Sequence, residues 1–243
     1  MITSLSPIKE VEMLNIRTAE SRGKANFGWL DSKHSFSFGS YYHPDHMGWS
    51  SLRVINDDRV TPGAGFDTHG HKDMEIISLV TQGAMEHRDS MGHIQHLPTG
   101  EFQLMSAGRG VTHSEYNASK SDPLKFLQIW IEPNETGGEP GYQQKAFGRT
   151  NGLTPIATQD GRDSSLRIRQ DAQLSQLVLQ PGQNESLVLD RSRRYYLHLV
   201  EGEALAGDIP LRSGDGLRVA ALDELKVSSA GDEPLWALWF DLP

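Results

Sequence analysis

The sequence predicts an all-β protein built from two copies of a small jelly-roll barrel. Its 24 glycines and 12 prolines separate short apolar runs, which is typical of strands joined by turns. No segment shows the 3.6-residue periodicity of a long helix, although short helical turns are expected near residues 21–23 and 171–173. The candidate strands include residues 36–38, 52–56, 75–80 and 126–131.

A repeated order of strand, glycine turn and strand indicates the two copies. In the first half this order covers residues 80–87 and 97–102, and in the second half it covers residues 200–207 and 211–217. Each copy continues through a further glycine-bearing turn into a third strand. Hairpins can resemble one another by chance, but the shared order of turns favours a duplicated barrel.

The boundary between the copies is expected in a polar segment. Residues 132–141 are rich in glycine and proline and follow a strong candidate strand. We therefore expect an N-terminal barrel over residues 1–132, a linker over residues 133–160 and a C-terminal barrel over residues 161–243.

Composition narrows the class of protein and its surroundings. The 243 residues carry a formal net charge of −9, which argues against direct nucleic-acid binding because phosphate contacts need a basic surface. The lack of cysteine excludes disulfides and thiolate metal ligands. The N-terminus does not resemble a signal peptide, and no run reaches the roughly 18 apolar residues of a membrane span. We expect a cytoplasmic protein that makes no membrane contact.

Two short pairs of side chains point to a metal site. His69 and His71 flank a glycine, and His113 and Glu115 flank a serine. Side chains two apart on a strand share a face, with Cα atoms roughly 6.5–7 Å apart. Two such strands can bring imidazoles and a carboxylate to one divalent first-row metal. Because such a set leaves coordination positions open, the pattern indicates a catalytic rather than a structural site.

Other titratable residues allow more than one interpretation. Glu75 could ligate from the face of His69 and His71, accept a hydrogen bond from a ligating histidine, or be a solvated charge. The second half has only His198 and no spaced pair, so the metal site is expected in the first half. Of the remaining histidines, three flank a probable hairpin and are expected to face solvent or lie in loops: His87, His93 and His96. Three others lie in an aromatic, irregular stretch, where any one could touch a substrate but structural roles are favoured: His34, His43 and His46.

Four segments together resemble the pirin family of cupin proteins. They are residues 36–39, 69–71, 107–115 and 127–131, which read Phe-Ser-Phe-Gly, His-Gly-His, Ala-Gly-Arg-Gly-Val-Thr-His-Ser-Glu and Leu-Gln-Ile-Trp-Ile. The run Gly-Arg-Gly-x-x-His-x-Glu is the most specific of them. The resemblance covers the N-terminal half strongly and the C-terminal half loosely.

The chain keeps one cupin motif and departs from the other. Gly63, the His69–His71 pair and Glu75 match the first motif. The second motif, Pro-x-Gly-x-x-His, is present at residues 98–103 without its histidine. Pirins share that departure and supply the histidine later, at the position of His113.

The resemblance implies a bicupin, with two jelly-roll β-barrels packed face to face and one metal in the N-terminal barrel. The implied ligands are His69, His71, His113 and Glu115. Iron(II) is the expected metal, with zinc, manganese, nickel, cobalt and copper as alternatives. For bacterial members the resemblance implies a dioxygenase that opens a flavonol such as quercetin and releases carbon monoxide.

In such an enzyme Glu115 is also expected to act as the catalytic base, since a carboxylate beside a metal is well placed to take a proton. Phe38, Met85 and Met105 are candidates for the wall of the substrate pocket, although they could equally be ordinary barrel core. The expected partners are a small aromatic substrate and dioxygen.

Two alternatives from other classes stay open. Animal pirins are described as nuclear, iron-dependent transcription cofactors, so the chain could be a metal-dependent regulator that binds a protein partner. It could also be another cupin enzyme that acts on a sugar or a small acid, because a fold alone does not define one reaction.

Overall fold

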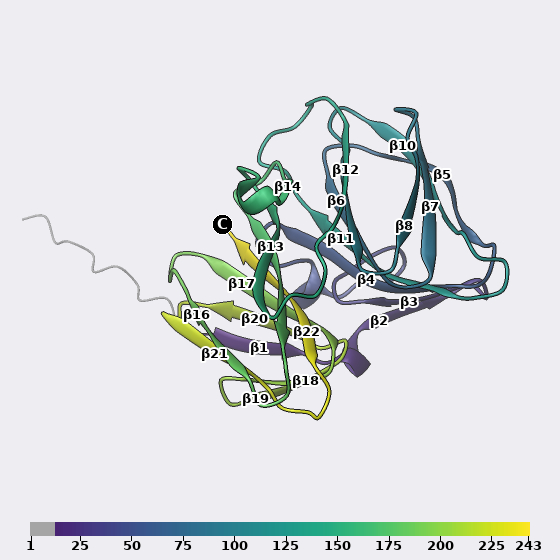
Figure 1. Ribbon diagram of the computed structural model, residues 1–243. Coiled ribbons are helices and arrows are strands. Elements are labelled where there is room, and N and C mark those ends of the chain that lie inside the picture. The colour runs from purple at the N-terminus through teal and green to yellow at the C-terminus, as the bar shows by residue number, and fades with distance from the viewer. Residues whose placement is uncertain (1–12) are drawn as a thin grey trace, which may run out of the picture.

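The computed structural model describes residues 13–243, which form two β-barrels packed against each other (Figure 1). The first barrel has a seven-stranded sheet in the order β12-β9-β6-β11-β4-β3-β2 and a four-stranded sheet in the order β5-β10-β7-β8. Its larger sheet contains β2 (Gly23–Asn26), β3 (Leu30–His34), β4 (Leu52–Val60), β6 (Glu75–Gln82), β9 (Glu101–Ser106), β11 (Leu124–Ile131) and β12 (Gly141–Ala146). Its smaller sheet contains β5 (Gly65–His71), β7 (Ala84–Asp89), β8 (Ile94–Pro98) and β10 (Val111–Asn117).

The second barrel repeats this plan. Its seven-stranded sheet has the order β1-β20-β17-β22-β15-β13-β14, and its four-stranded sheet has the order β16-β21-β18-β19. The larger sheet contains β1 (Met13–Arg17), β13 (Gly152–Thr158), β14 (Leu166–Arg167), β15 (Gln173–Leu179), β17 (Arg194–Glu201), β20 (Gly216–Ala220) and β22 (Leu235–Leu242). The smaller sheet contains β16 (Asn184–Val188), β18 (Glu203–Ala206), β19 (Ile209–Arg212) and β21 (Glu224–Ser229).

Short 3₁₀ turns complete the chain at η1 (Ala19–Ser21), η2 (Pro44–His46) and η3 (Arg162–Ser164). None of the described helices is long and apolar enough to cross a membrane.

The two large sheets pack face to face through a shared hydrophobic core. Ile77 and Ile129 of the first barrel and Leu174 and Phe240 of the second belong to this core and are fully buried. Because alternate side chains of a strand point to opposite faces, Ile77 packs against the other barrel while Ser78 lies on the opposite face of the same sheet. Each fully buried side chain of this size stabilises the fold by roughly 1.5–3 kcal/mol. The predicted all-β, face-to-face arrangement is confirmed.

The hairpins that suggested a duplication occupy equivalent places in the two barrels. Gly83 turns β6 into β7, and Gly202 turns β17 into β18, both with positive φ (80° and 86°). A Cβ at Gly83 would lie 2.9 Å from the Pro123 carbonyl oxygen, and one at Gly202 would lie 2.8 Å from that of Pro234. Glycine is therefore required at both turns by the backbone conformation and by the close approach of another strand.

The expected domain boundaries differ from the strand pairing. β1 precedes the first barrel in sequence but pairs with β20 of the second, with Met13 opposite Ala220, and it lies among the green and yellow strands in Figure 1. Residues 1–12 of the expected first barrel lie outside the described residues. The expected linker, 133–160, contains β12, which pairs with β9, and β13, which pairs with β15. Polar composition does not prevent pairing at or near a sheet edge, where one side of the strand can face water.

Two local predictions are also wrong. Residues 36–38 form no strand; the strand is β3, and Phe38 makes only an isolated bridge to Tyr41. No helical turn lies at residues 171–173, where the chain bends and enters β15. The turn expected near residues 21–23 is η1, slightly earlier in the chain.

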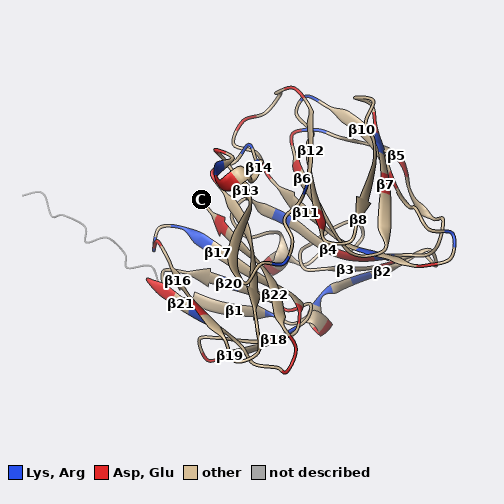
Figure 2. Cartoon of the chain, in the orientation of Figure 1, with Lys and Arg blue, Asp and Glu red and all other residues tan. Residues whose placement is uncertain are grey.

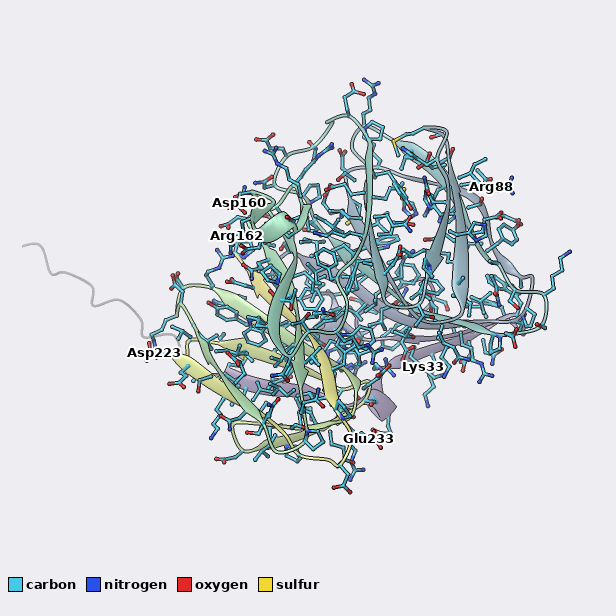
Figure 3. The ribbon with its side chains drawn as sticks, in the orientation of Figure 1. Lys33, Arg88, Asp160, Arg162, Asp223 and Glu233 are labelled. Carbon is cyan, nitrogen blue, oxygen red and sulfur yellow. The ribbon has the colours of Figure 1, made fainter. Side chains whose placement is uncertain are left out.

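Charged side chains lie mostly on the outside. Basic and acidic residues are scattered over both barrels (Figure 2), and the labelled Lys33, Arg88 and Asp223 lie at the periphery in Figure 3. Buried carboxylates are therefore informative, because a buried charge is costly unless it has partners. The first barrel buries Asp58, Glu75 and Glu115.

Candidate metal centre

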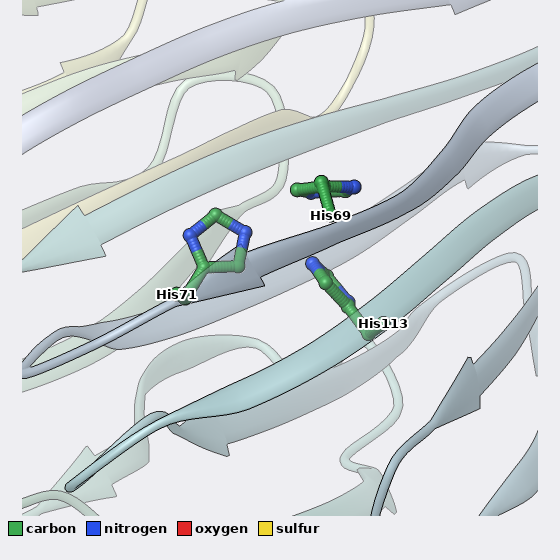
Figure 4. A group of neighbouring side chains, drawn as sticks. All are labelled: His69, His71 and His113. Carbon is green, nitrogen blue, oxygen red and sulfur yellow. The ribbon is translucent and has the colours of Figure 1, made fainter.

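Three histidines meet where β5 and β10 pair in the smaller sheet of the first barrel. His113 lies directly opposite His69 in the antiparallel register, and Val111 lies opposite His71. The ring centres are 4.8 Å apart for His69–His71, 4.5 Å for His69–His113 and 4.9 Å for His71–His113. Each residue offers one nitrogen within 4.8 Å of the others, and Figure 4 shows the three rings gathered close together.

The nitrogen atoms of this cluster fit a metal. The backbone carbonyl of Asp67 lies 2.7 Å from Nδ1 of His69; because a carbonyl only accepts, Nδ1 donates and Nε2 is left with its lone pair. Nε2 of His71 and both ring nitrogens of His113 are buried without a hydrogen-bond partner. Buried polar atoms nearly always have a partner, so these nitrogens indicate that a ligand completes the site.

Lowered pKa values keep two of the imidazole rings in the form that binds a metal. Burial, with the neighbouring histidines, lowers the pKa of His71 to about 3. Burial and the nearby His69 and His87 lower the pKa of His113 to about 3. Both imidazoles are therefore neutral at ordinary pH, which is the form that binds a metal.

Glu115 lies beside this cluster, in the next row of the sheet. The register shifts between His113 and Glu115, so that Glu115 pairs with Phe66; irregularities of this kind re-aim side chains near functional sites. The ligand atoms of Glu115, His113 and His87 lie within 4.8 Å of one another, and they form a group separate from that of the three histidines. Burial raises the pKa of Glu115, while the amide of Gln128 donates to its Oε1 and Oε2 at 3.3 and 3.0 Å.

His87 was expected to be solvent-facing or in a loop, and that prediction is wrong. It lies on β7, opposite Glu115 in the register, and is fully buried. Its Nε2 lies 3.1 Å from Oδ2 of Asp89, which also binds Nδ1 of His93 at 2.9 Å. The sequence does carry a signal that His87 is buried. Met85, His87 and Asp89 are two residues apart and share one face of the strand, and the apolar Met85 is expected to face inside.

Glu75 does not share the strand of the histidines. Strand β5 ends at His71, and Glu75 is the first residue of the next strand, β6. Its Oε2 accepts from Ser106 Oγ at 2.8 Å and from the backbone N–H of Arg169 at 3.2 Å. Arg169 follows β14 of the second barrel, so Glu75 links the two barrels rather than supporting the histidines.

A cavity of about 500 Å³ opens onto the cluster, within the usual range for small-molecule sites. Phe38 lines it, whereas Met85 and Met105 are fully buried in hydrophobic clusters and are not among its lining residues. Trp130 packs edge-on against His71 and Phe38, with ring centres 5.0 and 5.3 Å apart. The residues that line the cavity and carry its chemistry or its aromatic surface are Phe27, Trp29, Phe38, Phe66, His69, His71, Glu115, Gln128 and Trp130.

The second barrel has no equivalent cluster among the described residues. Its counterparts of the histidine strands are β16 and β21, whose Leu187, Leu225 and Val227 belong to a hydrophobic core. Apolar packing therefore fills the place that the first barrel gives to its histidines.

Two stacked jelly-roll barrels, of which only the first carries a histidine cluster among the described residues, define a bicupin with a candidate metal centre. Within that class the chain belongs to the pirin family. The family model described as Pirin matches residues 15–131, and the model described as the quercetinase C-terminal cupin domain matches residues 155–242.

Individual relatives agree with this assignment. The chain is 45% identical to the quercetin 2,3-dioxygenase of Escherichia coli K12 over 95% of this chain and 99% of that protein. It is 34% identical to the pirin-like protein YhaK of the same strain, over 95% of this chain and all of the other. The prediction of an oxidoreductase similar to quercetin 2,3-dioxygenases is confirmed at this level.

Solved structures extend the likeness to the fold and the metal. A crystal structure of YhhW from Escherichia coli superposes with a TM-score of 0.93 at 43% identity, over 95% of this chain and 98% of that one. A structure of bacterial pirin YhhW in complex with nickel(II) gives a TM-score of 0.92 at 42% identity, over 95% and 99%. With the unpartnered nitrogens of His71 and His113, this complex supports a divalent metal site.

Proposed function

We propose that the chain is a metal-dependent dioxygenase that opens a flavonol such as quercetin with dioxygen and releases carbon monoxide. The observation that carries the proposal is the histidine cluster, with its unpartnered nitrogens, in the wall of an aromatic cavity. The names of the relatives support the same reaction.

The proposed metal ligands are His69, His71, His113 and Glu115. Glu115 lies near His113 and, with His69 and His71, lines the cavity, so its carboxylate can complete the set. Iron(II) is the proposed metal, and the nickel complex of the YhhW relative makes nickel the first alternative. When bound, the metal supplies a Lewis acid that favours the anionic form of a substrate hydroxyl.

Protein side chains would take the substrate proton, position the substrate and exclude water. Glu115 would take the proton of the flavonol 3-hydroxyl, because burial raises its pKa and a base works best when its pKa lies near the ambient pH. Gln128 would hold that carboxylate in place through its amide. Phe38 and Trp130 would position the flat substrate and keep water out of the cavity.

The test is aerobic turnover of quercetin by protein of measured metal content. Loss of the flavonol absorbance, with carbon monoxide detected as a product, is expected for the loaded protein. His113→Ala and Glu115→Ala should abolish both signals. The matched control is His96→Ala, an exposed histidine on β8 whose side chain is 63% accessible.

Equal turnover after removal of the metal would refute the proposal. Loaded protein that leaves flavonols intact would instead favour another cupin reaction or a regulatory role. The proposed reaction needs only a small aromatic substrate and dioxygen, and the cytoplasmic location is part of the same proposal.

A further inference from the structure

A row of polar side chains crosses the large sheet of the first barrel. The register places Gln103 opposite Ser78, Ser78 opposite Gln128, Gln128 opposite Asn56, and Asn56 opposite His34. All five are buried. Directly opposed residues share a face of a sheet, so the row lies on one face across β9, β6, β11, β4 and β3.

The first three members of this row hold residues of the metal centre. Gln103 Nε2 lies 3.5 Å from Nδ1 of His87. Ser78 Oγ donates to Gln128 at 2.7 Å, and Gln128 donates to Glu115. The other two members, Asn56 and His34, bind each other instead and line the cavity.

His34 presents a hydrogen-bond acceptor. Its Nδ1 lies 2.7 Å from Oδ1 of Asn56; because an amide oxygen only accepts, Nδ1 donates and Nε2 keeps its lone pair. No hydrogen bond between described residues uses that Nε2. Burial lowers the pKa of His34, which keeps the ring neutral. The ring lies beside the aromatic ring of Phe38, with centres 5.5 Å apart.

Asp58 presents a second acceptor two residues along β4 from Asn56, on the same face. It is buried and lines the cavity, and its Oδ1 has no hydrogen-bond partner. Its opposite neighbour on β3 is Ser32, which also lines the cavity. A carboxyl group keeps an acceptor oxygen whether or not it is protonated, and such an oxygen, buried and unpartnered in the wall of a cavity, is costly unless a ligand supplies a donor.

We propose that His34 and Asp58 are specificity residues that accept hydrogen bonds from ring hydroxyls of a polyhydroxylated aromatic substrate. This inference rests on the proposed function, because it places the 3-hydroxyl ring of that substrate at the histidine cluster. Phenolic hydroxyls suit the site, since each is a donor on an apolar ring and the cavity wall is aromatic. A ring without those hydroxyls leaves both acceptors unpaired, which is how a polar site rejects an analogue.

The test is equilibrium binding to the metal-loaded protein without oxygen, followed by quenching of tryptophan fluorescence. Quercetin is compared with 3-hydroxyflavone, which keeps the metal-binding hydroxyl but lacks the other ring hydroxyls. The wild type should bind quercetin about tenfold or more tightly than 3-hydroxyflavone, as expected for hydrogen bonds made inside a protein. Equal affinities would overturn the proposal without recourse to any variant.

Two variants locate the discrimination. His34→Phe and Asp58→Leu should each weaken quercetin binding about fivefold or more and leave 3-hydroxyflavone within about twofold. The matched control is Asp57→Leu, which changes the adjacent residue on the opposite face of β4, paired with Arg22, and should preserve the preference. Equal loss of affinity for both ligands would indicate a structural role and overturn the proposal. If one variant fails to fold, the other decides.

The outcome separates this inference from the proposed reaction. Selective binding that depends on His34 and Asp58, without turnover in air, would support the hydroxyl site and refute the dioxygenase. Turnover of both flavonols with no selectivity would do the reverse.

Discussion

Gln128 donates its side-chain amide to both carboxylate oxygens of Glu115, at 3.3 and 3.0 Å, and accepts a hydrogen bond from Ser78 at 2.7 Å. The contact joins the two sheets of the first barrel, because Gln128 lies on β11 and Glu115 on β10. It fixes the direction of a buried carboxylate beside the histidine cluster.

Replacing Gln128 by Met tests this contact. Methionine has similar length but no amide, so Glu115 loses the two hydrogen bonds from Gln128 and keeps only the longer one from Ser78 Oγ, at 3.4 Å, while the cavity keeps its volume. Outer partners of metal ligands typically contribute about 10- to 100-fold in affinity or activity, and we expect a loss of that order in metal affinity or quercetin turnover. Metal titration and steady-state rates measure it; values within twofold of wild type would show that Glu115 is held by other contacts.

Asp89 is expected to stabilise the fold. Its side chain is fully buried and binds His87, His93 and the backbone N–H groups of Met91 and His93. Asp89→Asn should lower the free energy of unfolding at pH 7 by about 1–3 kcal/mol, as measured by urea denaturation.

The pH dependence of that loss has a defined sign. Hydrogen bonds from His87 and His93 outweigh burial and hold the pKa of Asp89 below its usual value of 3.8. The stability that Asp89 contributes is therefore present above that value and disappears as the pH falls through the lower folded-state pKa. A difference between wild type and Asp89→Asn that grows on acidification would contradict this.

Asp58 should show the opposite dependence. Burial raises its pKa from 3.8 to about 7, so the folded state holds a proton that the unfolded state releases. The stability due to that proton is complete below pH 3.8 and is lost as the pH rises through about 7. The free energy of unfolding of wild type minus Asp58→Asn should therefore fall between these values, by at most about 1.4 kcal/mol per pH unit. Both proteins are measured in chelator, and a rising difference would refute the account.

Glu75 should matter for the junction of the barrels and little for the metal. Glu75→Ala removes the acceptor for Ser106 and for the Arg169 backbone, and we expect a loss of about 1–3 kcal/mol in the free energy of unfolding. Metal content at saturation should stay at the wild-type level. A stable variant that fails to bind metal would assign Glu75 to the metal centre instead.

The histidine cluster could be predicted because its signal is local. His69 and His71 are two apart, so any strand places them on one face, and the segment of residues 107–115 identifies the partner strand by family resemblance. His87 was missed because a hairpin strand was interpreted as exposed, although Met85 on the same face was expected inside. The structure buries both, with Asp89 continuing the row.

The barrel boundaries could not be predicted because they depend on pairing across the whole chain. β1 joins β20 across some 200 residues, and nothing in five residues of strand specifies so distant a partner. Likewise β3 was not predicted, because its inward face carries the polar Ser32 and His34, which line the cavity, in place of the apolar side chains that indicate a strand.

The most direct test of the central claim is a titration of metal-free protein with iron(II), following quercetin turnover and bound metal together. The account predicts that the rate rises in proportion to bound metal and levels off at one metal per chain, and that His113→Ala binds no metal at this site and shows no turnover. Turnover that is independent of bound metal, or that persists in His113→Ala, would contradict it.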